Sequence, residues 1–164
     1  MDVHFVYHSG ASANLNFVSS LGDRKYKTLE TASTHIGETV VKATQNEEKV
    51  TLSTIQYENN SYAGKSIENK KKSVNLSAMT CGDIGFAAAP YEMFDTNGQE
   101  IRAASPCKMT FVCTLTNGSL GYIPSALAVP HGAYEVNKTK FAHGSGEEFA
   151  GELVRMLKAC KDKE

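Results

Sequence analysis

The sequence lacks the features that mark several common classes of protein. No apolar run approaches the roughly 20 residues that a membrane-spanning helix requires, so we expect no transmembrane segment. Basic residues are not in excess, because 17 lysines and arginines are matched by 18 acidic residues, and this balance excludes recruitment to nucleic acid by bulk charge. Residues 1–10 contain neither a positive nor an apolar segment, so they predict no signal peptide and leave the compartment open.

The four cysteines also lack a metal-binding pattern. None forms a C-x-x-C pair and no histidine lies at zinc-finger spacing from one, so we expect reduced, mostly buried thiols. Hydrophobic residues make up 41% of the chain, which is enough to bury a core, and charged residues make up 21%, an ordinary share for a folded protein. The 164 residues therefore form a single globular domain or a fragment of a larger one.

Hydrophobic periodicity predicts alternating strands and helices. Residues 28–44 place apolar side chains on one helical stripe, and residues 145–148 are typical of a capping box that opens a second amphipathic helix. A further helix is expected between Pro90 and about Ala104, because proline is tolerated at a helix start. This interleaved order predicts an α/β or α+β fold with a mixed sheet and flanking helices. The expected strands are residues 3–7, 50–57, 74–78, 84–89, 109–115 and 133–138, and the small apolar run 84–89 indicates burial on both faces.

The most polar segment of the chain is residues 59–72, which contains Lys70, Lys71 and Lys72 in succession. Three lysines without aromatic neighbours are typical of a solvated surface. We therefore interpret this segment as an exposed loop in preference to a binding patch.

Two residues lie where rigid folds present functional groups, just beyond the ends of core strands. Glu92 follows the strand expected at residues 84–89, and Tyr122 follows the strand expected at 109–115 and a loop with two glycines. The pattern alone leaves alternatives open. Glu92 is either a functional carboxylate or a first-turn acid that complements a helix dipole. Tyr122 is either a ligand or proton donor, or a packed aromatic side chain.

A series of short motifs in residues 82–158 resembles the neutral/alkaline (non-lysosomal) ceramidases and their bacterial relatives. The longest is GDIGFAAAPYEMF at residues 82–94, which resembles the glutamate-bearing motif of that family. The series covers about half of the chain in the family's order. The others are Ser105-Pro106, TFV at 110–112, Asn117-Gly118, GYIP at 121–124, YEV at 134–136 and the helix opening GSGE at 144–147.

The resemblance implies a zinc-dependent amidohydrolase acting on ceramide or another N-acyl amide. In that family the zinc is held by two histidines, one glutamate and one tyrosine. Glu92 falls on the glutamate position, Tyr122 on the tyrosine position, and Tyr134 on a tyrosine beside the substrate amide. Zinc accepts carboxylate oxygen readily and activates water or a carbonyl group at an open position. The resemblance further implies that residues 1–164 are the C-terminal portion of a larger catalytic domain.

The sequence also departs from the family. The family's zinc histidines lie upstream of the region matched here, and His4 and His8 are no substitute, because four residues of strand span about 13 Å. The loop at residues 10–16 matches the family's glycine–aspartate loop, which carries a serine nucleophile. Here Leu15 stands at the nucleophile position and Asn14 at the aspartate position. Leucine is neither a nucleophile nor a base.

Two hypotheses follow. In the first, the chain contributes Glu92 and Tyr122 to a zinc site that the upstream portion of the same polypeptide completes, and the substrate is a small-molecule or lipid amide. In the second, it is a non-catalytic family member that acts as a binding or structural module. The first hypothesis predicts that Glu92 and Tyr122 point toward one another, and that the 164 residues alone bind zinc weakly.

Overall fold

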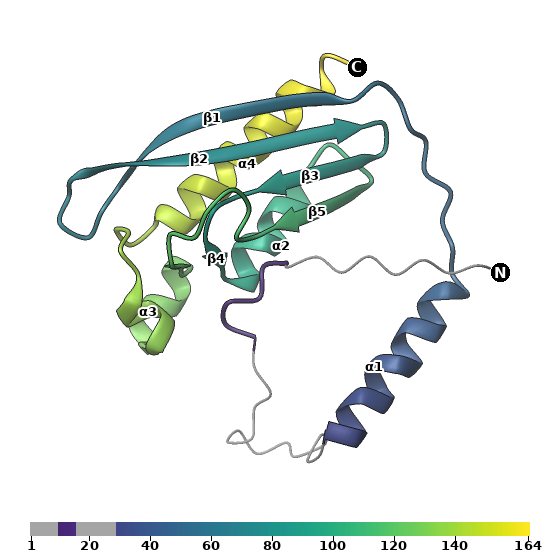
Figure 1. Ribbon diagram of the computed structural model, residues 1–164, viewed down its shortest axis with the longest axis horizontal. Coiled ribbons are helices and arrows are strands. Elements are labelled where there is room, and N and C mark those ends of the chain that lie inside the picture. The colour runs from purple at the N-terminus through teal and green to yellow at the C-terminus, as the bar shows by residue number, and fades with distance from the viewer. Residues whose placement is uncertain (1–9, 16–28) are drawn as a thin grey trace. The chain divides into compact units, whose positions relative to one another are not determined.

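The computed structural model describes residues 10–15 and 29–164, which belong to two compact units (Figure 1). The smaller unit, residues 15–49, contains helix α1 (Leu29–Thr44) and so confirms the helix expected there. The larger unit, residues 1–14 and 50–164, contains all the other elements. The strand expected at residues 3–7 lies outside the described residues.

A four-stranded mixed sheet with strand order β1-β2-β3-β5 forms the centre of the larger unit (Figure 1). Strands β1 (Gln56–Lys65), β2 (Lys71–Cys81) and β3 (Ile84–Ala88) are antiparallel neighbours, whereas β5 (Met109–Cys113) runs parallel to β3. A parallel pair needs a crossover, and helix α2 (Asp95–Ala104) lies in the connection between β3 and β5. The expected mixed sheet with flanking helices is confirmed.

Helix α4 (Ser145–Lys161) packs beside α2 against the same face of the sheet (Figure 1). The helix buries the apolar stripe that its sequence predicts, and each large side chain in it contributes about 1.5–3 kcal/mol by leaving water. On the sheet side, Val74 and Leu76 of β2 are fully buried beneath it. The buried residues of the stripe are Phe149, Ala150, Leu153, Met156, Leu157 and Cys160.

Two short helices and a second, two-stranded sheet complete the larger unit. Strands β4 (Glu92–Met93) and β6 (Tyr122–Ile123) pair in parallel, apart from the main sheet. A 3-10 helix, η1 (Ala126–His131), and helix α3 (Tyr134–Lys138) follow β6. Except for β4, which precedes α2, these elements lie between β5 and α4 in the chain, and together they carry Glu92, Tyr122 and Tyr134.

Several sequence-based expectations are wrong in detail. The strand expected at residues 50–57 begins only at Gln56, and most of the polar segment 59–72 is not a loop but the β1–β2 hairpin. Pairing over ten residues of β2 overrides the polar composition of β1, whose side chains alternate between exposed and half-buried along most of the strand. Residues 133–138, expected as a strand, contain helix α3.

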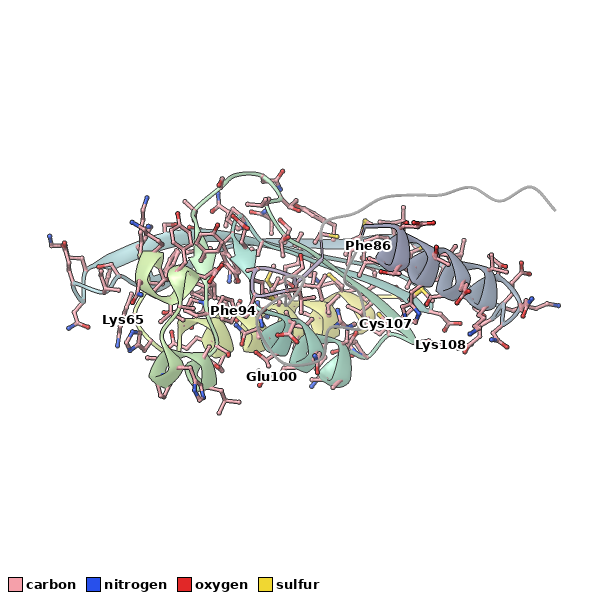
Figure 2. The ribbon with its side chains drawn as sticks, turned by 90° about the horizontal axis from the view of Figure 1, so that it is seen from below. Lys65, Phe86, Phe94, Glu100, Cys107 and Lys108 are labelled. Atoms are coloured by element: carbon pink, nitrogen blue, oxygen red, sulfur yellow. The ribbon has the colours of Figure 1, made fainter. Side chains whose placement is uncertain are left out.

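The strand β3 is buried on one face only, contrary to the expectation from its apolar run. Gly85 and Ala87 are buried on the side of the helices, whereas Ile84, Phe86 and Ala88 are half-buried on the other side. Figure 2 labels Phe86 and shows it across the sheet from the helix that carries Glu100. Partial exposure of alternate residues is typical of a mixed sheet covered by helices on one face.

The capping box expected at the start of α4 is also absent. The N-cap residue is Gly144, whose φ of 87° is left-handed, and no side chain caps the helix. Ser145 is already the first helical residue. The Glu147 carboxylate accepts a hydrogen bond from the Ala126 backbone N–H at 2.7 Å. This bond joins α4 to the segment after β6.

Candidate functional site

The two residues predicted as metal ligands lie side by side. In the parallel ladder of β4 and β6, Glu92 is the register partner of Tyr122. The Glu92 N–H donates to the Gly121 carbonyl at 2.9 Å, which fixes that register. Because paired residues on neighbouring strands point to the same face, and strands lie about 4.8 Å apart, the carboxylate and the phenol emerge together. The structure therefore brings Glu92 and Tyr122 into one site.

Buried neighbours hold Glu92 in place. Tyr91 and Met93 on either side of it are fully buried, so the alternation of the strand directs Glu92 outward. The Tyr91 ring packs 6.4 Å from Phe141 and 5.5 Å from Phe149, centroid to centroid. The alternative that Glu92 lies in the first turn of a helix is wrong, because α2 begins at Asp95.

The loop before Tyr122 is shaped by unusual backbone conformations. Asn117 has a φ of 60° and Gly121 a φ of 85°, both left-handed values that glycine and asparagine tolerate best. The Leu120 N–H donates to the Pro90 carbonyl at 2.6 Å, which ties this loop to the segment before Glu92. Beyond it, the Thr139 hydroxyl donates to the Tyr122 carbonyl at 2.8 Å. Both ends of Tyr122 are thus anchored.

Tyr134, the predicted substrate-side tyrosine, joins the same site. It begins α3 rather than the expected strand, and its ring meets Tyr122 edge-on with the centroids 6.1 Å apart. The side chain is 62% exposed, so it forms part of an open surface. The Lys138 ammonium group lies over the Tyr134 ring, 5.7 Å from its centroid. All three residues that the resemblance selected are therefore adjacent.

The electrostatics of the site favour a protonated Tyr122. The nearby Glu92 carboxylate raises the pKa of the Tyr122 phenol above its ordinary value, chiefly by its negative charge, and burial, Tyr134 and Glu135 add to the effect. A hydrogen bond from the phenol to Glu92 acts in the same direction. Within the described residues, no lysine or arginine forms an ion pair with Glu92.

The loop at residues 10–14 supports the site from the other end of β4. The Ala13 N–H donates to the Met93 carbonyl at 3.0 Å. Asn14 accepts from the Asp95 N–H at 2.8 Å and donates to the Asp95 carboxylate at 2.6 Å, so it caps α2 from a distant part of the chain. This positioning role was not predicted, and the only signal for it is a cap-forming residue at the family's aspartate position. Leu15 is 62% exposed.

The donor set fits part of a zinc site. A carboxylate and a phenol are oxygen ligands that the family's zinc uses, and both are present here at adjacent register positions. Among the described residues, no three histidine, cysteine, aspartate and glutamate side chains are grouped to hold a metal. His4 and His8 lie outside the described residues. The four cysteines are free thiols.

Comparisons with known proteins agree on the fold. No model of a known family and no curated protein matches the sequence. Among solved structures, the neutral ceramidase from Pseudomonas aeruginosa is similar with a TM-score of 0.64 and 12% identity, over 92% of this chain and 35% of that one. A ceramidase complexed with C2 is similar with a TM-score of 0.52 and 16% identity, over 56% of this chain and 15% of that one.

These likenesses show a ceramidase-like fold. The chain spans about a third, or less, of the length of the two ceramidases it resembles. Among the described residues, no helix has both the length and the apolar character needed to cross a bilayer. The mixed α/β architecture that carries Glu92, Tyr122 and Tyr134 therefore has a ceramidase-like fold.

Proposed function

We propose that this chain is the C-terminal portion of a ceramidase-like, zinc-dependent amidohydrolase that acts on an N-acyl amide. Glu92 and Tyr122 supply two of the zinc ligands, and Tyr134 lies beside the substrate amide. The observation that carries the proposal is the β4–β6 register, which pairs the two ligand candidates across one ladder. The contact between the rings of Tyr122 and Tyr134 supports the third role.

Each residue has a distinct task in this proposal. When bound there, zinc supplies Lewis-acid activation of the amide carbonyl and of a water molecule. The Glu92 carboxylate supplies negative charge, and the Tyr122 phenol gives up its proton to become a ligand. Tyr134 is open to solvent and offers a hydroxyl to the substrate. With leucine at position 15, no side chain there attacks the amide, so a water molecule is the nucleophile.

The remaining ligands come from elsewhere in the polypeptide. A catalytic zinc needs three or more protein ligands, and Glu92 and Tyr122 supply two. Both similar ceramidases are much longer than the part this chain matches. We therefore place the histidine ligands in the upstream portion of the same polypeptide.

Leu15 favours a second candidate, a family member without catalysis. An exposed aliphatic side chain stands where the resemblance implies a nucleophile. In this alternative the site surface around Tyr122 and Tyr134 binds a ligand without hydrolysing it, or serves as a structural module.

Zinc analysis of the natural reading frame that encodes this chain tests the proposal. We expect one zinc per protein and hydrolysis of N-acyl amides, with Glu92→Gln and Tyr122→Phe each losing zinc. Tyr134→Phe should retain zinc and lose catalytic efficiency. Glu100→Gln is the matched control, since it neutralises an exposed carboxylate of α2 outside the β4–β6 pair. A protein that is zinc-free and inert favours the second candidate, and zinc that survives Glu92→Gln refutes the assignment of the ligand.

A further inference from the structure

A second site lies at the turn of the β1–β2 hairpin. The turn of the hairpin and Lys140 line a surface pocket of about 350 Å³. An isolated antiparallel bridge joins Ser66 to Phe141, and the Ile67 N–H donates to the Lys140 carbonyl at 3.2 Å. Figures 1 and 2 both show this end of the hairpin, where Figure 2 labels Lys65, near α3. Two segments that are far apart in the sequence therefore build the pocket.

The pocket concentrates positive charge. Its lining includes Lys70, Lys71, Lys72 and Lys140 and one acid, Glu68, which gives it a formal charge of +3, whereas the whole chain carries −1. Glu68 pairs with Lys70 at 2.6 Å, but both side chains are mostly exposed and such a pair is weak. Within the described residues, Lys71, Lys72 and Lys140 have no carboxylate partner. Their mutual repulsion opposes folding unless an anion compensates it.

The scaffold beneath these lysines is held by its own hydrogen bonds. The Ser66 hydroxyl oxygen accepts from the backbone N–H groups of Glu68 and Lys70, both at 3.2 Å. The Ser66 N–H donates to the Lys70 carbonyl at 2.9 Å, and Asn69 takes a left-handed φ of 57° to close the turn. These hydrogen bonds fix the backbone of the turn, and the lysine side chains therefore extend from fixed positions.

Of the four lysines, Lys72 packs against an aromatic ring. Its ammonium lies 4.6 Å from the centroid of the Phe141 ring, which is itself buried. Partial burial, followed by the charge of Lys140, lowers the pKa of Lys72 below its ordinary value. Lys72 and Lys140 line the same pocket, so an anion between them would relieve the repulsion.

We propose that this pocket binds the phosphate group of a phosphorylated ligand, with Lys71, Lys72 and Lys140 as the contacts. A phosphate monoester carries close to two negative charges and three acceptor oxygens, which matches several lysines better than a singly charged carboxylate does. The volume exceeds that of a phosphate alone, and Ile67, 60% exposed, offers apolar contact to the remainder of the ligand. The ligand is either a soluble phosphate monoester or a lipid headgroup. The inference does not depend on the zinc proposal.

Calorimetry and vesicle sedimentation with the 164-residue chain distinguish the two sources. The soluble probe is phenyl phosphate at low ionic strength, and the lipid probe is phosphatidylcholine vesicles with and without phosphatidic acid. We expect saturable one-to-one binding of phenyl phosphate, or binding only to vesicles with phosphatidic acid. In either case Lys140→Gln and Lys71→Gln should each weaken binding about tenfold, the loss expected for one charge-assisted hydrogen bond. Both side chains are exposed, so both variants should fold.

Two controls make the result decisive. Lys140→Arg keeps the charge and should retain binding, and Lys158→Gln removes an exposed lysine of α4 that does not line the pocket. If neither probe binds, the proposal is wrong. The proposal is also wrong if Lys158→Gln weakens binding as much as the pocket variants do. It is equally wrong if Lys140→Gln and Lys71→Gln leave vesicle binding unchanged, because the attraction would then be general to the protein surface.

Discussion

At the scale of single residues, the site depends on a tyrosine whose buried hydroxyl has no hydrogen-bond partner among the described residues. The Tyr91 hydroxyl is fully buried and has no partner among the described residues. Burial also raises the pKa of this phenol far above its ordinary value, so it stays neutral. An unpaired buried hydroxyl costs about 1–3 kcal/mol. The packing of the Tyr91 ring against Phe141 and Phe149 outweighs that cost and fixes the neighbouring Glu92.

We therefore predict that Tyr91→Phe stabilises the chain by about 1 kcal/mol, because it removes the unpaired hydroxyl and keeps the ring. Urea denaturation followed by circular dichroism measures the change. Tyr134→Phe is the control, since this tyrosine is 62% exposed and its loss of a hydroxyl should change stability by less than about 0.5 kcal/mol. A destabilising Tyr91→Phe would mean that the hydroxyl has a partner, such as a bound water.

At the scale of elements, the first turn of α4 supports the strand that carries Tyr122. Gly146 packs against the Asn97 side chain, and a Cβ atom at this glycine would lie 2.7 Å from the Pro124 carbonyl oxygen, just beyond β6. In the same region, the Glu147 carboxylate accepts a hydrogen bond from the Ala126 N–H. The close approach of helix and strand therefore requires glycine at position 146.

Substitution of two glycines of α4, Gly146 and Gly151, tests whether close packing requires glycine at position 146. Gly146→Ala should destabilise the chain by about 1–3 kcal/mol, because the added methyl group overlaps the Asn97 side chain and a fixed carbonyl. Gly151→Ala, on the exposed side with nothing within 4 Å of the new Cβ, should stabilise it by about 0.5–1 kcal/mol through helix propensity. Equal effects of the two substitutions in urea denaturation would contradict the packing argument.

At the scale of the whole molecule, the chain provides two adjacent donors in a fold similar to that of two much longer ceramidases. Zinc affinity depends on the number of ligands and on the cost of deprotonating them. Two oxygen ligands are fewer than a catalytic zinc requires, and one of them is a phenol whose pKa the Glu92 carboxylate raises. The described part of the chain should therefore hold zinc poorly without the rest of the polypeptide.

We predict that the 164-residue chain binds zinc with a dissociation constant on the order of 10 µM or weaker at pH 7. The raised pKa means that Tyr122 keeps its proton at neutral pH, so binding must release it and should strengthen as pH rises, by about tenfold per pH unit between about pH 6 and 8. Calorimetry measures the dissociation constant at each pH. Titrations in buffers of different ionisation enthalpy measure the proton that binding releases. Tight one-to-one binding at pH 7 that Glu92→Ala abolishes would show a complete site within this chain.

The sequence by itself determined the elements whose signal is local. Residues 84–88 and 109–113 have the apolar composition of core strands, and the stripe from Phe149 to Cys160 repeats at helical spacing, so periodicity was sufficient for both. An ordered series of short motifs was sufficient to select Glu92, Tyr122 and Tyr134. It gave no information on their distances, because sequence order does not specify which strands pair.

Only the tertiary structure decided the features that depend on pairing between distant segments. Residues 56–65 are polar, yet they form a strand because β2 satisfies their backbone groups, and Tyr134 begins a helix where its composition suggested a strand. The same kind of pairing places Glu92 beside Tyr122 and brings Lys140 to the lysines of the hairpin. These contacts join segments up to 75 residues apart, and a local sequence pattern cannot indicate hydrogen bonds between such distant segments.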